Sequence, residues 1–202
     1  TQSRSSAASD VYKRQDNAYE DYKICMEKVY EFSSYIAINI SSPNTQNLRK
    51  LSGEEYLDSL LRELKKVQIE LSLNFGYRPI FLKISPDENL NNLENICKLI
   101  LKNEIDGIIC TNTTLEHNEK YGEGGLSGEP LREKSTDTVI TVKKFLGEEV
   151  TIIASGGVMS VADYNEKIAS GADLVQIYTG FIFEGPKLID DILNQDKHQR
   201  KT

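Results

Sequence analysis

Residues 35–49, with the sequence YIAINISSPNTQNLR, constrain the fold of this chain more than any other stretch. The segment begins with a mostly apolar, β-branched run formed by Ile36, Ala37, Ile38 and Ile40. Such a run predicts a strand of a parallel sheet that is covered on both faces. Small polar residues then occupy positions 39, 41, 42, 44 and 45, with Pro43 between them. In parallel α/β folds this end of a strand carries the active site, although the same residues also suit a simple turn before Pro43.

Four more strand-length apolar segments follow, and stretches of helical periodicity separate them. We expect strands at residues 80–84, 107–114, 150–157 and 174–178. Helices are expected at residues 19–32, 88–103 and 160–170, from near residue 52, from a cap at Ser135 and from Pro186. Five such units indicate an α/β fold. A closed (β/α)₈ barrel needs eight, so we expect a partial TIM barrel.

Composition excludes several classes of protein. The 202 residues can bury one core, and the net charge of −7 without any basic run argues against nucleic acid as a partner. No apolar stretch approaches the roughly 20 residues of a membrane span. Cys25, Cys97 and Cys110 lie far apart, and only two histidines accompany them, so we expect no metal site. Each cysteine is expected to be a small buried hydrophobe in a reduced, cytoplasmic protein.

Polar residues interrupt or end the later strands. Lys83 lies within the apolar run IFLKI, where a charge is costly unless it is paired or functional. The alternative to a functional role is a lysine whose aliphatic stem is buried and whose ammonium reaches solvent. Thr111, Asn112 and Thr113 end the next strand, where they suit either a ligand site or a turn. Residues 115–135 then form a long loop with four glycines, among them Gly128. Glycines allow a ligand to approach the backbone closely, but such a loop is weak evidence alone.

The last two predicted strands end in glycine and hydroxyl groups. These residues are Gly156, Gly157, Tyr178, Thr179 and Gly180. In (β/α)₈ barrels the corresponding backbone N–H groups often bind one phosphate, so a phosphate subsite is predicted here. Tight turns alone are the alternative interpretation.

Six segments together resemble a known family, the class 2, quinone-dependent dihydroorotate dehydrogenases, with the bacterial members most similar. The segments are NISSPNT with the following Leu48 and Arg49, LKISPD, TNTT, GGLSG, ASGGV and LVQIYTGFIFEGP. They occur in the family's order and extend over about residues 16–192. The resemblance implies that the five units correspond to strands four to eight of the family's barrel.

The family's chemistry is FMN-dependent oxidation of dihydroorotate to orotate in de novo pyrimidine (UMP) biosynthesis, with electrons passed to quinone. The resemblance implies that Ser42 is the catalytic base. Serine at this position indicates class 2, since class 1 members carry cysteine there. It assigns the substrate to Asn39, Asn44, Asn112 and Thr113. It assigns FMN to Asn39, Lys83, Thr111, Gly128, Gly157, Tyr178 and Thr179. Much of the loop after the third strand is a flexible lid over the substrate in the family.

The resemblance also implies missing parts. Three barrel units and the N-terminal segment that binds quinone at the membrane have no counterpart, so we expect a fragment that is inactive and aggregation-prone alone. We expect residues 1–15 to be a disordered or foreign tail, residues 16–193 to be the FMN-binding partial barrel, and residues 194–202 to be a solvated tail. The parent enzyme is expected in the cytoplasm, peripherally on the inner membrane.

Other functions remain open from the sequence. One is an inactive half-barrel that binds flavin or phosphate only. Another is a different FMN barrel, such as a dihydrouridine synthase acting on RNA, although the acidic balance and the SSPN segment argue against it. The third is a purely structural or interaction module.

Overall fold

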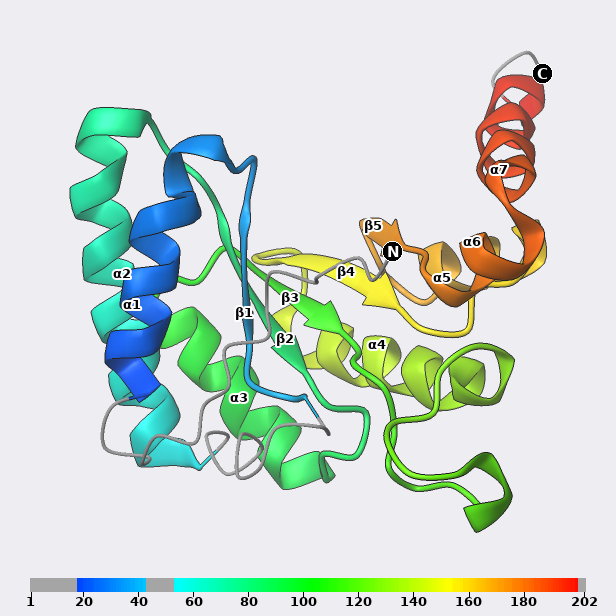
Figure 1. Cartoon of the computed structure of the whole chain (residues 1–202), viewed down its shortest axis with the longest axis horizontal. Helices are drawn as coiled ribbons and strands as arrows, with labels where there is room; N and C mark the ends of the chain where they lie inside the picture. The colour runs from blue at the N-terminus through cyan, green and yellow to red at the C-terminus, as the bar shows by residue number, and fades with distance from the viewer. Residues whose placement is uncertain (1–17, 43–52, 200–202) are drawn as a thin grey trace.

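The computed structural model describes residues 18–42 and 53–199, and these form one parallel sheet with helices along it (Figure 1). The five strands are β1 (Ile36–Asn39), β2 (Ile80–Ile84), β3 (Gly107–Cys110), β4 (Thr151–Ser155) and β5 (Leu174–Gln176). Their spatial order follows the chain order, and every neighbouring pair is parallel. Strands β1 and β5 are therefore the two edges of the sheet.

Helices connect consecutive strands, as parallel pairing requires. The connecting helices are α2 (Glu54–Phe75), α3 (Leu90–Lys102), α4 (Arg132–Leu146) and α5 (Val161–Ala169). Helix α1 (Ala18–Val29) precedes β1, and α6 (Thr179–Glu184) and α7 (Pro186–Gln199) follow β5. Short 3₁₀ turns occur at Tyr30–Phe32, Glu119–Tyr121 and Glu129–Leu131. The predicted α/β fold of a partial barrel with five units is confirmed.

The core lies between the sheet and the helices that cover one of its faces. Side chains alternate along each strand, so one set of strand residues packs against α1, α2, α3 and α4. Those fully or nearly fully buried in this set are Ile36, Ile38, Ile80, Leu82, Ile84, Ile108, Cys110, Ile152 and Ala154. Helix α2 contributes Leu57, Leu60, Leu61, Leu64 and Val67 from a single apolar stripe.

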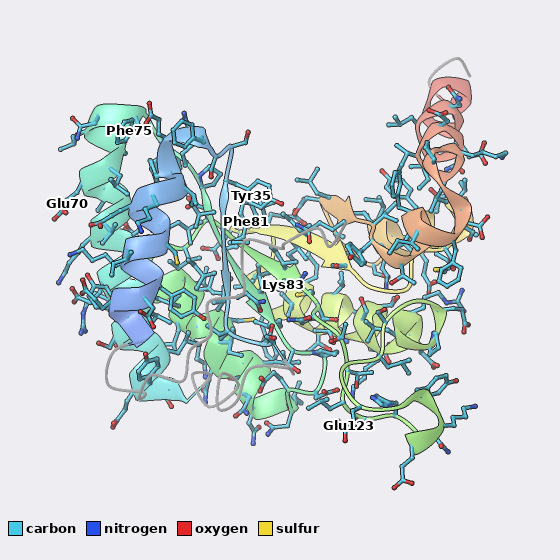
Figure 2. All side chains as sticks on the ribbon, in the orientation of Figure 1. Tyr35, Glu70, Phe75, Phe81, Lys83 and Glu123 are labelled. Carbon is cyan, nitrogen blue, oxygen red and sulfur yellow. The ribbon has the colours of Figure 1, made fainter. Side chains whose placement is uncertain are left out.

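The opposite face of the sheet is much less covered, which corrects the prediction for the first strand. Ala37 of β1 is exposed, so this strand is buried on one face rather than on two. Phe81, Ile109 and Ile153 form a small apolar cluster here, and the Tyr35 ring meets Phe81 edge-on, 5.6 Å between centroids (Figure 2). Gly107 leaves room for the Phe81 ring, since a Cβ there would lie 2.2 Å from it.

Three other expectations differ from the structure. Cys25 is exposed on α1, whereas Cys97 and Cys110 are buried as predicted. Ser135 does not cap its helix, because α4 already begins at Arg132 and places Ser135 inside its first turns. Helix α7 continues to Gln199, so residues 194–199 are helical rather than a tail, and α7 projects away from the sheet (Figure 1).

Some predictions concern residues outside the described ranges, namely the tail at residues 1–15 and the substrate residue Asn44. None of the described helices is long and apolar enough to cross a membrane. Within residues 18–42 and 53–199, no three His, Cys, Asp or Glu side chains are grouped so that they hold a metal ion.

Candidate active site

A pocket of about 220 Å³ opens at the carboxyl ends of β2, β3, β4 and β5. Its lining residues are Lys83, residues 111–113, Ser127, Gly128, Leu131, residues 155–158 and residues 176–180. Four strands and the segment before α4 thus contribute to one site. This is the end of a parallel sheet at which ligands bind in α/β barrels.

The segment after β3 is held in place by bonds to both neighbouring strands. The Thr111 N–H donates to the Ser155 carbonyl at 2.7 Å, and the Asn112 N–H donates to the Ile84 carbonyl at 2.8 Å. The Asn112 carboxamide oxygen accepts a hydrogen bond from the Thr113 N–H at 2.8 Å. These bonds fix Asn112 with its amide nitrogen directed toward the end of β1.

An amide and hydroxyl network joins the ends of β1 and β3. The Asn112 Nδ2 donates to Asn39 Oδ1 and to Ser41 Oγ, both at 3.2 Å. Ser41 Oγ lies 3.1 Å from Asn39 Oδ1 and 3.0 Å from the Lys83 carbonyl oxygen. The Ser41 hydroxyl donates its single proton to one or the other of these two acceptors. Because each group has a partner inside the network, the side-chain amides of Asn39 and Asn112 are held in one orientation.

A tyrosine supports this network from the helix-covered side. The Tyr22 hydroxyl of α1 donates to the Asn39 carbonyl at 2.7 Å. Burial raises the pKa of Tyr22, with the neighbouring Tyr56 acting in the same direction. The phenol therefore stays protonated and remains a donor over the whole physiological pH range.

Lys83 supplies the pocket with a cation. Its side chain is half-buried and lines the pocket (Figure 2). It lies on the face of the sheet opposite the core, which we call the inner face. Burial lowers its pKa below the ordinary value for lysine. Among the residues that the structure describes, no carboxylate forms an ion pair with this ammonium. An uncompensated cation of this kind suits an anionic or electron-rich ligand.

Glycines shape the opposite wall of the pocket. Gly156 and Gly157 follow β4 with φ angles of 118° and 76°, in the left-handed region that favours glycine. A Cβ at Gly157 would lie 2.2 Å from the Arg132 Cα, so the pair packs directly against the start of α4. Across the wall, Ser127 Oγ lies 3.0 Å from Thr179 Oγ1. Glycine backbone and hydroxyl side chains therefore line this side, a composition that suits a phosphate.

The structure brings most of the predicted site residues together. Those that line the pocket are Lys83, Thr111, Asn112, Thr113, Gly128, Gly157, Tyr178 and Thr179. Asn39 reaches the pocket through its bond from Asn112. Ser42 is half-buried next to Ser41, at the same end of the sheet, but does not line the pocket formed by the described residues. The individual roles of these residues remain predictions.

Four polar residues at the site were not singled out by sequence reasoning. Ser41 connects three parts of the amide network, and Ser127, Ser155 and Gln176 line the pocket. Ser155 and Gln176 pair in register at the ends of β4 and β5. Period-two alternation would have placed both on the inner face, because Ile153 and Leu174 precede them by two residues.

Fold and site together define an α/β half-barrel whose pocket combines a lysine, side-chain amides and a glycine-rich wall at the carboxyl ends of the strands. A family model described as Dihydroorotate dehydrogenase matches residues 5–199. The chain belongs to the dihydroorotate dehydrogenase family, as the six sequence segments indicated.

Several relatives agree with this membership. The chain is 52% identical over 182 residues to a "Dihydroorotate dehydrogenase (quinone)" of Aliivibrio salmonicida, covering 87% of this chain and 54% of the relative. It is 50% identical over 185 residues to the protein of the same name from Vibrio parahaemolyticus, with 88% and 55% covered. The chain thus spans about half the length of the curated relatives it matches.

Solved structures show the same fold. The DHODH of Eimeria tenella in complex with ferulenol superimposes with a TM-score of 0.81 at 31% identity, covering 86% of this chain and 52% of that one. The ligand-free type of the Eimeria tenella protein gives a TM-score of 0.80 at 35% identity, with 87% and 54% covered. This chain therefore spans about half of each of these two proteins.

Proposed function

We propose that these five units carry the flavin and pyrimidine side of a quinone-dependent dihydroorotate dehydrogenase, which oxidises dihydroorotate to orotate. The observation that carries the proposal is the pocket at the carboxyl ends of β2 to β5. It gathers eight residues that the family resemblance assigned to flavin or pyrimidine, although they come from distant parts of the chain.

The chemistry of the pocket fits FMN. Lys83 offers a half-buried cation without a carboxylate partner among the described residues, which suits an electron-rich ring. The wall formed by Gly156, Gly157 and Thr179 offers backbone and hydroxyl groups that suit a phosphate. When bound, FMN supplies a two-electron acceptor. Lys83, Thr111, Gly128, Gly157, Tyr178 and Thr179 are the residues that would hold it.

The remaining polar residues fit a planar pyrimidine. Asn39 and Asn112 are oriented by the shared bonds with Ser41, and such fixed amides donate to and accept from the edge of a pyrimidine ring. Thr113 lies beside them in the pocket wall. Preorganised amides of this kind lose little freedom when the substrate binds.

Ser42 is proposed as the base that removes the proton from C5 of dihydroorotate. A hydroxyl is a weak base near neutral pH, so Ser42 must release its own proton to water as it takes up the proton from C5. We expect Ser42→Ala to slow substrate oxidation by a factor of about 10² or more while orotate affinity is kept. The matched control is Ser34→Ala, which removes an exposed hydroxyl before β1, outside the pocket.

The experiment that tests the function is anaerobic. Purified chain is mixed with FMN, dihydroorotate is added, and the absorbance of the oxidised flavin is followed. The proposal predicts substrate-dependent bleaching, in contrast to the sequence-based expectation of an inactive fragment, and it predicts that Ser42→Ala slows this bleaching whereas Ser34→Ala does not. Binding of FMN without any bleaching by dihydroorotate would contradict the assigned reaction and leave a flavin-binding half-barrel.

A further inference from the structure

Lys167 of α5 is a fully buried lysine that lies behind the pocket rather than in it. Its ammonium donates to the Arg132 carbonyl at 2.9 Å, to Ser135 Oγ at 3.1 Å and to Thr136 Oγ1 at 2.6 Å. All three acceptors are uncharged and belong to the first turns of α4. A buried ammonium is costly without an anion, so three well-placed acceptors indicate a specific task.

The bonds continue from α4 to the floor of the pocket. Ser135 Oγ accepts from Lys167 and donates its own proton to the Ser155 carbonyl at 2.9 Å. The same carbonyl accepts the Thr111 N–H at 2.7 Å. Ser155 and Thr111 both line the pocket. The ammonium is therefore two hydrogen bonds away from Ser155 at the end of β4 and three away from Thr111 after β3.

The first turn of α4 also packs directly against Gly156 and Gly157. A Cβ at Gly157 would lie 2.2 Å from the Arg132 Cα, and a Cβ at Gly156 would lie 3.3 Å from the Ser135 Cβ. The first turn of α4 thus touches both glycines with no space between. Interiors packed this closely transmit displacements, so any shift of this turn moves the Gly156–Gly157 backbone.

Burial lowers the pKa of Lys167 and outweighs the carboxylates of Glu166, Asp163 and Asp137, which act to raise it. Asp163 of α5 accepts from Arg132 Nη1 at 2.8 Å and from Ser160 Oγ at 2.8 Å. Burial acts to raise the pKa of Asp163, but these bonds and one from the Met159 N–H outweigh it and hold the pKa below its ordinary value. Asp163 and Arg132 therefore form their own pair, which ties α4 to α5 independently of Lys167.

We propose, on the basis of the flavin site proposed above, that Lys167 is a positioning residue for the phosphate subsite. Its ammonium holds the first turn of α4, and this turn fixes the Gly156–Gly157 backbone against which the flavin phosphate binds. Lys167 does not line the pocket itself, and it acts through Arg132 and Ser135.

The test compares FMN with riboflavin, which lacks the phosphate. Affinities of both flavins are measured by fluorescence for the unmodified chain, for Lys167→Met and for the control Lys98→Met, an exposed lysine of α3 that pairs with Glu94. We expect Lys167→Met to reduce the preference for FMN by about tenfold or more while riboflavin affinity is kept. Lys98→Met leaves the preference unchanged. A merely structural role would weaken both flavins equally, and that result overturns the proposal.

A second variant avoids removing the buried charge. Thr136→Val deletes the acceptor at 2.6 Å but keeps the shape of the side chain, and we expect a smaller loss of the same preference. If the unmodified chain binds FMN and riboflavin equally, the phosphate subsite is wrong and the proposal for Lys167 falls, whereas the flavin pocket remains.

If the unmodified chain binds neither flavin, the proposed function fails for this chain, and Lys167 is judged without ligand. Amide ¹⁵N order parameters of Gly156 and Gly157 are then compared between the unmodified chain and Lys167→Met, with Gly122 of the distant loop as the internal reference. Lower order at Gly156 and Gly157 alone supports the positioning role. Unchanged order at both overturns it.

Discussion

The two faces of the sheet differ in what fills them. The helix-covered face is packed by aliphatic side chains that have lost nearly all contact with water, such as Ile80, Leu82 and Ile108. Among the described residues, the inner face carries one cluster of three buried apolar side chains, Phe81, Ile109 and Ile153. Beyond that cluster the same face bears Lys83, Ser155 and Gln176, which line the pocket.

This difference separates stability from binding within each strand. Because successive side chains point to opposite faces, β2 places Leu82 in the core and Lys83 at the pocket. Substitutions on the two faces should therefore have opposite consequences. The helix face should control unfolding, and the inner face should control ligand affinity.

The largest effect is expected on the helix face. Leu61 of α2 is fully buried, and Leu61→Ala should lower the free energy of unfolding by about 3 kcal/mol, because it leaves a cavity in the core. Leu73 of the same helix is 83% exposed, and Leu73→Ala should change the free energy of unfolding by less than about 0.5 kcal/mol. Urea denaturation measures both. Equal effects would contradict the assignment of this face as the core.

Lys167, whose side chain lies between α5 and α4, allows the energetic cost of a buried charge to be measured. Burial lowers the pKa of Lys167 from 10.5 to about 8. Between these values the unfolded chain binds more protons than the folded chain, so the contribution of Lys167 to stability rises as pH increases. Relative to Lys167→Met, the unmodified chain should gain roughly 2 kcal/mol between pH 8 and 10.5. A pH-independent difference between the two unfolding curves would contradict this.

Lys83 sharpens the comparison on the inner face. Burial lowers its pKa, so the protonated lysine makes an unfavourable contribution to folding at neutral pH. Lys83→Met should raise the free energy of unfolding by about 1 kcal/mol, with allowance for partial exposure, and should weaken FMN binding. Thermal melting and flavin titration on the same samples measure the two effects. If Lys83→Met loses stability and keeps its FMN affinity, the claim that the inner face controls ligand binding rather than stability is contradicted.

The smallest effect is expected where the two edges of the sheet approach each other. The Tyr35 hydroxyl accepts a hydrogen bond from Gln176 Nε2 at 3.0 Å, linking a residue before β1 to β5. Tyr35→Phe removes this exposed bond and should cost less than about 0.5 kcal/mol. Tyr35→Ala also removes the contact with Phe81 and should cost about 1 kcal/mol. Equal melting temperatures for the two variants would show that the contact between Tyr35 and Phe81 does not contribute to stability.

The sequence predicts strand positions well where one short apolar run is bounded by turn residues. The run IFLKI coincides with β2 residue for residue. The expected strand at residues 107–114 ends at Cys110, because the following residues turn toward β1 and the pocket. Cys25 fits a helical spacing but lies outside the narrow stripe of α1 that meets the core, which spacing alone does not show.

Other site features depend on contacts between distant segments. Ser135 matches the pattern of a helix cap, yet its hydroxyl is used by Lys167 and Ser155, which lie 32 and 20 residues away. Lys167 itself resembles an ordinary surface lysine of a short helix. Only the packing of α5 against α4 reveals it as buried. Motif recognition found eight of the pocket residues, whereas Ser127, Ser155 and Gln176 and the residues that support the pocket required the structure.

The central claim is that a flavin binds the inner face at the carboxyl ends of the strands. The most direct measurement is an NMR titration of the ¹⁵N-labelled chain with FMN. The account predicts that the amide signals of Thr111, Gly157 and Gly180 shift together, while those of Leu61 and Val67 on α2 stay in place. Shifts confined to the helix face, or no saturable shift at the three pocket residues, would contradict it.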